Sequence, residues 1–257
     1  MREFANLYTA LDETLALLRN YFEHAPLQDA AWGFYFLIGR RPRRVSSGRK
    51  LAEWAAAQAG VPDWLFSESY DAVGDIAETI TLLLPETESE SDLPLHQWIE
   101  ERLLPLQNMS EAEQQTIVLQ AWRESSRAQR FIWNKLITGE FRVGISQKLV
   151  LRAIADVSGI PVEVIAHRQM GQWEPTADFY RQLVHAETKD ADRSRPYPFF
   201  LAYPLESDPA EALGDLVDWQ VEWKWDGIRA QLIRRAGQVF LWSRGEELVT
   251  ERYPEIA

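Results

Sequence analysis

One lysine lies between two carboxylates in the stretch from Glu222 to Arg229, which has the sequence Glu-Trp-Lys-Trp-Asp-Gly-Ile-Arg. If this stretch is a strand, alternation places Glu222, Lys224 and Asp226 on one face and the two tryptophans on the other. The Asp-Gly pair predicts a tight turn, because glycine tolerates positive φ and aspartate bonds to its own backbone. A lysine placed in this way is either a salt-bridged surface residue or a nucleophile.

Two other segments accompany this lysine. Residues 241–246 have the sequence Leu-Trp-Ser-Arg-Gly-Glu, and residues 196–202 have the sequence Pro-Tyr-Pro-Phe-Phe-Leu-Ala. The pattern Lys-x-Asp-Gly-x-Arg at 224–229 resembles one motif of the covalent nucleotidyltransferases, and residues 241–246 resemble the motif that follows it. This superfamily includes DNA ligases, RNA ligases and capping enzymes. The proline-rich segment is similar to the opening of the adenylation domain of ATP-dependent DNA ligases.

The resemblance implies a role for each matching residue. Lys224 matches the nucleophile that attacks the α-phosphorus of ATP, and its amine must be neutral to do so. Glu222 matches the residue that recognises the adenine amino group, and Arg229 matches the arginine that binds near the ribose and helps order the site. Arg244 matches the arginine that contacts the 5′-phosphate at a nick.

ATP and Mg²⁺ are the cofactors that the resemblance implies. We expect magnesium to neutralise charge on the phosphates and to align the leaving group. No side chain of this chain is predicted to be a metal ligand.

A second candidate phosphate site is the turn after Gly139. Free backbone N–H groups and the positive end of the helix that follows suit a phosphate there. The run from residue 133 to residue 151 is similar to a segment of the helical DNA-binding domain of ATP-dependent DNA ligases. The predicted DNA-binding residues of this turn are Arg142, Gly144, Ser146 and Lys148.

The charges of the chain are segregated, although its net charge is −12. Residues 40–50 contain six basic residues and no acid, and two of them, Arg43 and Arg44, are predicted to bind DNA. Residues 123–152 contain seven basic residues against two acids. Two basic segments on an acidic protein could guide a polyanion to one face, and the alternative is that they are solvated helix faces.

The composition limits the remaining possibilities. Cysteine is absent, which excludes disulfides and thiolate metal sites. We find no signal peptide and no apolar run long enough to span a bilayer. We therefore expect a soluble, monomeric protein of the cytoplasm that does not bind membranes.

Local patterns predict helices first and strands afterwards. The predicted helices lie at about 1–24, 29–39, 49–59, 76–84, 93–104, 111–122, 126–138 and 176–186, with a short one opened by Pro62 and another capped by Ser146. Ser110 and Glu113 form a predicted capping box. The predicted strands lie at 220–225, 228–235 and 238–243, with Ala236-Gly237 as the turn between the last two.

This order predicts two domains rather than one interleaved fold. We expect a mainly α, helical DNA-binding domain at residues 1–190. A linker and the first antiparallel β-strands of an α+β adenylation domain would follow at residues 191–257.

The expected function is that of a bacterial-type ATP-dependent DNA ligase, which seals nicks in double-stranded DNA through a lysyl-AMP intermediate. Only 33 residues follow Lys224, and the later family motifs and the oligonucleotide-binding barrel are absent from them. We therefore expect a fragment that cannot ligate alone.

Two main alternatives remain. An RNA ligase or capping-type nucleotidyltransferase would share Lys-x-Asp-Gly, but we would not expect the helical region before it. A non-catalytic helical DNA-binding module would make Lys224 incidental. An acidic helical protein with no nucleic-acid role is a further possibility.

Overall fold

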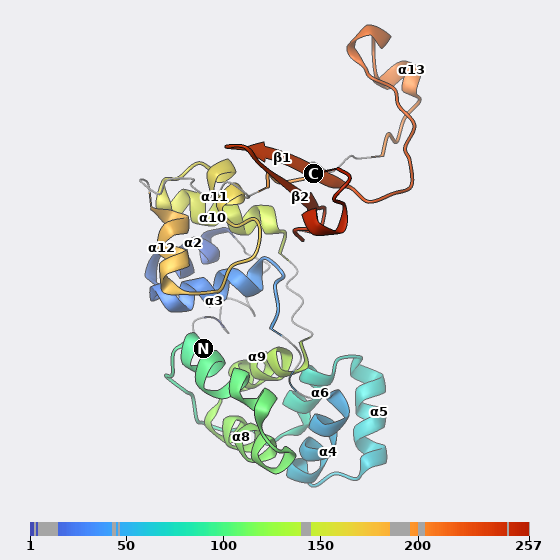
Figure 1. The fold of residues 1–257 in the computed structure, drawn as a ribbon. Helices are drawn as coiled ribbons and strands as arrows, with labels where there is room; N and C mark the ends of the chain where they lie inside the picture. The colour runs from blue at the N-terminus through green and yellow to red at the C-terminus, as the bar shows by residue number, and fades with distance from the viewer. Residues whose placement is uncertain are drawn as a thin grey trace. The chain divides into compact units, whose positions relative to one another are not determined.

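The computed structural model describes two compact units. The described residues are 1–2, 4, 15–42, 45, 47–139, 145–185, 196–199, 204–245 and 247–256. The first unit holds residues 1–162 and 174–186, and the second holds residues 163–173 and 187–257. The first is helical and the second contains the one sheet of the described residues (Figure 1). The expected fold class, helices followed by antiparallel strands, is confirmed.

The helices of the first unit form two groups (Figure 1). One group consists of α2 (Leu15–His24), α3 (Leu27–Leu37), α10 (Gln147–Ser158) and α12 (Ala177–Val184). The other consists of α4 (Gly48–Ala59), α5 (Asp63–Val73), α6 (Ile76–Leu83), α8 (Glu111–Glu124) and α9 (Arg127–Thr138). Between α6 and α8 the chain forms α7 (Leu95–Gln97), η1 (Trp98–Leu103) and η2 (Leu104–Asn108). The unit is therefore assembled from segments far apart in sequence.

Three buried tryptophans, one each from η1, α8 and α9, form part of the core of the first unit. Trp98, Trp122 and Trp133 are almost fully buried. The rings of Trp98 and Trp133 meet edge to face with centroids 5.1 Å apart, a favoured aromatic geometry. The indole N–H of Trp122 donates to Oδ1 of Asn134 at 2.8 Å. This core joins η1 to α8 and α9, which belong to the basic segment at residues 123–152 in part.

The helix ends follow the local signals. Ser110 and Glu113 form the predicted capping box before α8, and the hydrogen bonds from Ser110 hold the pKa of Glu113 below its usual range. The side chain of Ser146 accepts from Leu149 N–H at 3.4 Å and caps α10. Gly139 ends α9 in the left-handed conformation, with φ 67°. The predicted capping box, the predicted cap by Ser146 and the predicted end of the helix at 126–138 are confirmed.

Two helical predictions are wrong in detail. Pro62 is the N-cap of α5 rather than its first helical residue. The region predicted as one helix at 93–104 is a short α-turn, then the π-helix η1, then the 3₁₀-helix η2. Pro105, at the start of η2, has no N–H to continue an α-helical ladder, so the chain changes its hydrogen-bond spacing there.

The sheet of the second unit is a hairpin of β1 (Ala230–Arg235) and β2 (Gln238–Ser243). Its register runs from Ala230 opposite Ser243 to Arg235 opposite Gln238. Ala236 and Gly237 form the turn with φ of 50° and 78°. Two positive φ values in a two-residue loop are typical of a type I′ turn, whose twist suits a hairpin. The two predicted strands and the turn between them are confirmed.

The rest of the second unit contains elements that were not predicted. These are α11 (Val162–Arg168), α13 (Pro209–Ala212), η3 (Leu216–Asp218) and η4 (Thr250–Arg252). Its buried apolar side chains come from two distant regions, with Ile165 and Met170 from the first and Ile233, Leu241 and Trp242 from the hairpin. Residues 163–173, which precede the predicted linker, therefore belong to the hairpin's core.

The predicted strand at 220–225 is wrong. This segment has no regular secondary structure, and Val221, Trp223 and Trp225 are 87%, 85% and 79% exposed. A strand needs a neighbour that bonds its backbone N–H and C=O groups. No described residue pairs with this segment, and the apolar alternation gains nothing without a surface to bury against.

Candidate functional site

The two arginine-containing motifs meet at the open end of the hairpin. The backbone N–H of Arg244 donates to the carbonyl of Arg229 at 2.8 Å. This bond continues the strand pairing one step beyond Ala230 and Ser243. Two residues separated by 15 positions in the chain are therefore fixed opposite each other.

Arg229 also closes the Asp-Gly turn with its side chain. Its Nη1 donates to the carbonyl oxygens of Trp225 at 3.1 Å and Gly227 at 2.8 Å. Carbonyls in an irregular loop need donors, and this guanidinium supplies them. Arg229 thus orders the loop that follows Lys224.

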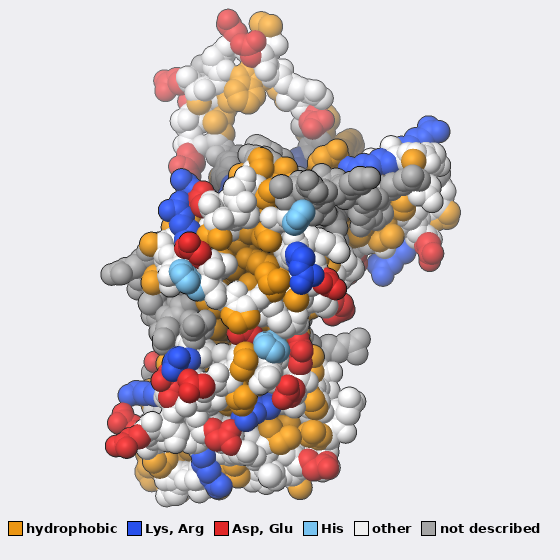
Figure 2. Space-filling view, turned by 90° about the vertical axis from the view of Figure 1, so that its left-hand side faces the viewer, with side chains coloured by type: hydrophobic (Ala, Val, Ile, Leu, Met, Phe, Trp, Pro, Cys, Tyr) orange, Lys and Arg blue, Asp and Glu red, His pale blue; other side chains and the backbone are white. Residues whose placement is uncertain are grey.

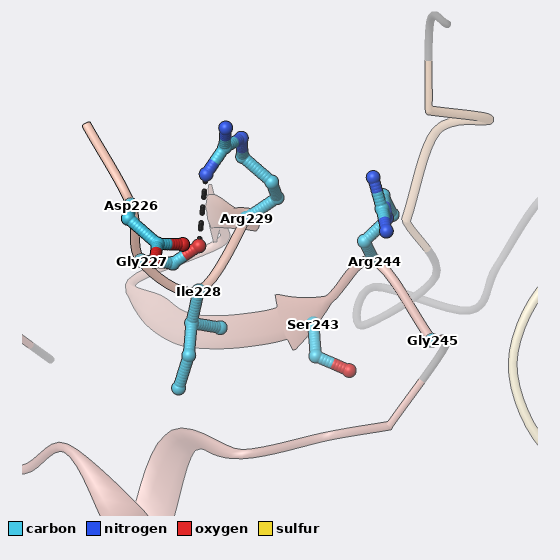
Figure 3. A pocket seen from close by; sticks show the side chains of 7 residues that line it. All are labelled: Asp226, Gly227, Ile228, Arg229, Ser243, Arg244 and Gly245. Atoms are coloured by element: carbon cyan, nitrogen blue, oxygen red, sulfur yellow. Dashed lines mark hydrogen bonds between the residues drawn. The ribbon is translucent and has the colours of Figure 1, made fainter. Parts of the chain in front are cut away.

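A pocket of about 410 Å³ opens beside these arginines. Its lining residues are Asp226, Gly227, Ile228, Arg229, Ser243, Arg244 and Gly245. In Figure 3 the side chains of Arg229 and Arg244 point to one side of the hairpin end, and those of Ile228 and Ser243 point to the other. Neither guanidinium forms an ion pair with a described carboxylate. Two such guanidinium groups suit a phosphate.

The predicted nucleophile does not line this pocket. Lys224 and Glu222 are both exposed, and the alternation that would align them with Asp226 is absent because the segment is not a strand. The structure therefore brings Arg229 and Arg244 together but does not bring Lys224 or Glu222 to them.

The other predicted sites lie in the helical unit. Ser146 caps α10, and Lys148 is exposed in the first turn of that helix. Four further predicted DNA-binding residues lie outside the described residues: Arg43, Arg44, Arg142 and Gly144.

The two basic segments of the sequence lie side by side. The side chain of Arg41 donates from Nη1 to the carbonyl of Gly139 at 3.0 Å. The backbone N–H of Val45 donates to the carbonyl of Ile137 at 3.4 Å. These bonds join the segment before α4 to the end of α9, so segments that are about 95 residues apart meet at one place.

Some of the basic residues are structural rather than available to a ligand. Arg130 is buried and donates to the carbonyls of Pro85 and Trp122 at 3.0 and 2.8 Å, and burial lowers its pKa. Lys135 is buried in an ion pair with Asp75. Burial alone would raise the pKa of Asp75, but hydrogen bonds from Lys135 and from the Glu78 N–H hold it below its usual range.

Figure 2 shows the charged side chains on one face of the described residues. Basic and acidic side chains are intermixed on the face shown, with no continuous basic patch. The sequence count of seven basic residues at 123–152 therefore overstates the positive surface, because Arg130 and Lys135 are buried.

Neither a ligand set for a metal nor a membrane span is present in the described part of the chain. No three histidine, aspartate or glutamate side chains gather there in a way that could hold a metal ion. None of its helices has both the length and the apolar character needed to cross a bilayer.

Comparison with known proteins decides the family. Residues 1–155 match the family model described as DNA ligase N terminus. Residues 200–257 match the model described as ATP dependent DNA ligase domain. The chain belongs to the ATP-dependent DNA ligases.

Two relatives align along almost the whole ligase chain, and a third aligns along about half of it. A probable DNA ligase of Koribacter versatilis is 26% identical over 258 residues, covering 95% of this chain and 44% of the relative. A probable DNA ligase of Streptomyces avermitilis is 25% identical over 262 residues, covering 96% and 44%. A DNA ligase of Methanothrix thermoacetophila is 32% identical over 124 residues, covering 48% and 22%. The ligase chain spans less than half the length of these relatives.

Sequence reasoning missed two features of the ligase site. The loop carbonyls of Trp225 and Gly227 that Arg229 binds were not predicted, because a side-chain bond to a carbonyl has no residue-type signature. The packing of Gly171 against Trp242 was also missed. A glycine after a short helix was the one available signal, and it is common to many turns.

Proposed function

We propose that this chain provides the DNA-binding region and the adenylated lysine of a ligase that seals nicks in double-stranded DNA with ATP. The observation on which the proposal depends is the pairing of Arg229 with Arg244 beside one pocket. Two guanidinium groups held by backbone pairing suit a phosphate of ATP or of DNA. The ligase would act as a monomer in the cytoplasm.

The first step is adenylation of Lys224. Its neutral amine Nζ attacks the α-phosphorus of ATP and forms a P–N bond, the bond to the bridging oxygen breaks, and pyrophosphate leaves while the amine loses a proton. Glu222 would recognise the adenine amino group. Arg229 would support the site by ordering the Trp225–Arg229 loop, which agrees with its bonds to that loop. Magnesium, when bound with ATP, would neutralise phosphate charge.

The later steps transfer AMP to DNA. The 5′-phosphate oxygen at the nick attacks the lysyl-AMP phosphorus and releases Lys224. The 3′-hydroxyl then attacks the adenylated 5′-phosphate, and AMP leaves as the strand is sealed. Arg244 would contact the 5′-phosphate, which its exposure at the rim of the pocket permits.

The helical region would hold the duplex by its phosphates rather than by its bases. The meeting of the two basic segments at Arg41 and Gly139 supports one binding surface. We propose that this surface belongs to a domain ending near residue 190. Its DNA-binding residues would be Arg43, Arg44, Arg142, Gly144, Ser146 and Lys148.

We also propose that the 257-residue chain does not ligate alone. Lys224 and Glu222 are exposed and lie outside the lining of the pocket. A nucleophile outside the pocket is not held in line with the α-phosphorus of an ATP bound there. The catalytic geometry would therefore depend on other parts of a ligase of its relatives' length.

Fluorescence anisotropy tests the binding half of this proposal. The chain is titrated with nicked, intact and single-stranded DNA of several sequences across a salt series. Salt-sensitive binding to duplexes with little sequence preference is expected. Failure to bind duplex DNA at low salt would overturn the assignment of the helical region.

Transfer of label from ATP tests the catalytic half. With ATP labelled at the α-phosphorus, a ligase of its relatives' length containing these residues should acquire a label that alkali leaves intact and acid removes. Lys224→Ala should abolish the label, whereas Lys148→Ala, an exposed lysine of the helical unit, should retain it. Labelling that survives Lys224→Ala would refute Lys224 as the nucleophile, and efficient labelling of the 257-residue chain would refute its inactivity.

A further inference from the structure

The hairpin register defines a face that ends in the two arginines. Gln231 is directly opposite Trp242, and Arg229 is bonded across to Arg244. Residues directly opposite each other share a face, as do alternate residues along a strand. We call the face formed by Arg229, Gln231, Trp242 and Arg244 the arginine face. Figure 3 agrees, since both arginines point away from the side occupied by Ser243.

A segment outside the hairpin packs against this face at Trp242. The Trp242 side chain is 5% exposed. Gly171, which lies in the same unit, has φ +81°, and a Cβ built there would lie 3.2 Å from Cη2 of Trp242. Glycine is thus favoured twice, by the left-handed backbone and by the close approach of the indole.

Tyr197 binds the arginine face at Gln231. The backbone N–H of Tyr197 donates to Oε1 of Gln231 at 3.0 Å, and Nε2 of Gln231 donates to the Tyr197 carbonyl at 2.5 Å. The Tyr197 ring also lies 5.3 Å from the ring of His167, in α11. Residues 163–173 and the segment at Tyr197 therefore support the same face.

The two supports are placed in the same way relative to the arginines. Trp242 is two residues before Arg244 on β2, and Gln231 is two residues after Arg229 on β1. On this face Arg244 is therefore the neighbour of Trp242, and Arg229 is the neighbour of Gln231. Both Trp242 and Gln231 are held by residues outside the hairpin. Beyond these supports the face is open and forms the pocket rim.

We infer that Gly171 and Tyr197, acting through Trp242 and Gln231, are positioning residues that aim Arg229 and Arg244 at a phosphate. A hairpin that loses either support can twist about its own axis, and the two arginine side chains would no longer be held on the same side of the hairpin end. The inference depends on the proposed role of Arg244 at the 5′-phosphate of a nick.

The experiment compares two nicked duplexes that differ in one group. The full 257-residue chain is titrated with nicked DNA bearing either a 5′-phosphate or a 5′-hydroxyl at the nick, and the ratio of the two Kd values is measured by anisotropy. Binding by the helical unit contributes equally to both and cancels in the ratio. Arg244→Ala should reduce the preference for phosphate by about tenfold, as expected for one lost charge-assisted interaction.

Gly171→Ala is the diagnostic variant, and Gly237→Ala is its control. Gly237 has φ +78° and nothing within 4 Å of a Cβ placed there, so both changes strain a left-handed residue but only one presses on Trp242. Gly171→Ala should lower the phosphate preference by at least about threefold, while Gly237→Ala leaves it near the wild-type value.

A second pair of variants serves if Gly171→Ala does not fold by circular dichroism. Gln231→Ala removes both bonds to Tyr197, and Gln238→Ala removes an exposed glutamine at the far end of the same hairpin. The first should reduce the phosphate preference and the second should not.

The outcomes separate the two proposals. If Arg244→Ala leaves the phosphate preference unchanged, or the wild-type chain has none, the proposed role of Arg244 fails and the inference fails with it. If Arg244→Ala removes the preference but the diagnostic variants behave like their controls, the positioning role alone is refuted.

Discussion

The backbone N–H of Arg244 and the carbonyl of Arg229 form a 2.8 Å hydrogen bond at the open end of the hairpin. Because this bond continues the register of β1 and β2, the strand pairing holds the backbones of the two arginines opposite each other. Backbone geometry thus pairs the two arginines of the candidate site, and the Arg229 side chain binds the loop that follows Lys224.

Loss of the Arg229 side chain should loosen the loop that follows Lys224. In Arg229→Ala, the Trp225 and Gly227 carbonyls lose their donor, so hydrogen exchange of residues 225–229 should become faster. Hydrogen–deuterium exchange measured by mass spectrometry tests this. Arg234→Ala, an exposed arginine of β1, is the control, and equal acceleration in both variants would count against the loop-ordering role.

Lys135→Ala should destabilise the helical unit. The change leaves Asp75 without its ion-pair partner between α6 and α9, and the expected loss is about 2 to 4 kcal/mol, because a partly buried carboxylate is then uncompensated. Urea unfolding measures it. Lys50→Ala removes an exposed pair with Glu111 and should cost less than about 1 kcal/mol. Similar losses of unfolding free energy in the two variants would show that burial does not strengthen the Lys135–Asp75 pair.

The contribution of Asp75 should depend on pH. Its pKa in the folded protein lies below the ordinary 3.8, so its stabilising effect is complete above that value and disappears as the pH falls through the folded pKa. Asn retains the helix cap but not the charge. Asp75→Asn should therefore cost more free energy of unfolding at pH 7 than at about pH 3. A penalty independent of pH, relative to Asp71→Asn on exposed α5, would contradict this assignment.

Lys148→Ala should weaken binding to duplexes of different sequence by the same factor. One lost phosphate contact should reduce the slope of log K against log salt by about one. Anisotropy across a salt series provides the measurement. Arg181→Ala, on α12 and paired locally with Asp178, should leave the slope unchanged. A loss confined to particular sequences would mean that Lys148 reads bases.

Ser110→Ala should destabilise the protein by about 1 kcal/mol, because the box with Glu113 before α8 is lost. Urea unfolding at neutral pH tests this. Ser69→Ala removes a hydroxyl inside α5 that bonds to the Leu65 carbonyl, and a change of less than about 0.5 kcal/mol is expected. Equal losses would mean that the cap contributes nothing beyond a surface hydroxyl.

Local structure was largely predictable from the sequence. The capping serines, the end of α9 before Gly139 and the Ala236-Gly237 turn were predicted correctly, because each depends on interactions within a few residues. The family, too, was apparent from motif order. The cap and turn signals are independent of the rest of the chain.

Tertiary structure decided which of these local features form a site. Burial removes Arg130 and Lys135 from the protein surface, although in sequence they are indistinguishable from exposed cations. Pairing between distant residues places Arg229 with Arg244, and Gly171 against Trp242.

The segment around Lys224 shows that a local pattern can also predict an element that does not form. Its alternation predicted a strand, yet a strand exists only where a second segment bonds to it, and none of the described residues does so. The sequence by itself thus determined most of the helices, the hairpin and the family. Partners far away in the chain determined burial, pairing and the arginine site, because these energies depend on contacts that no short pattern contains.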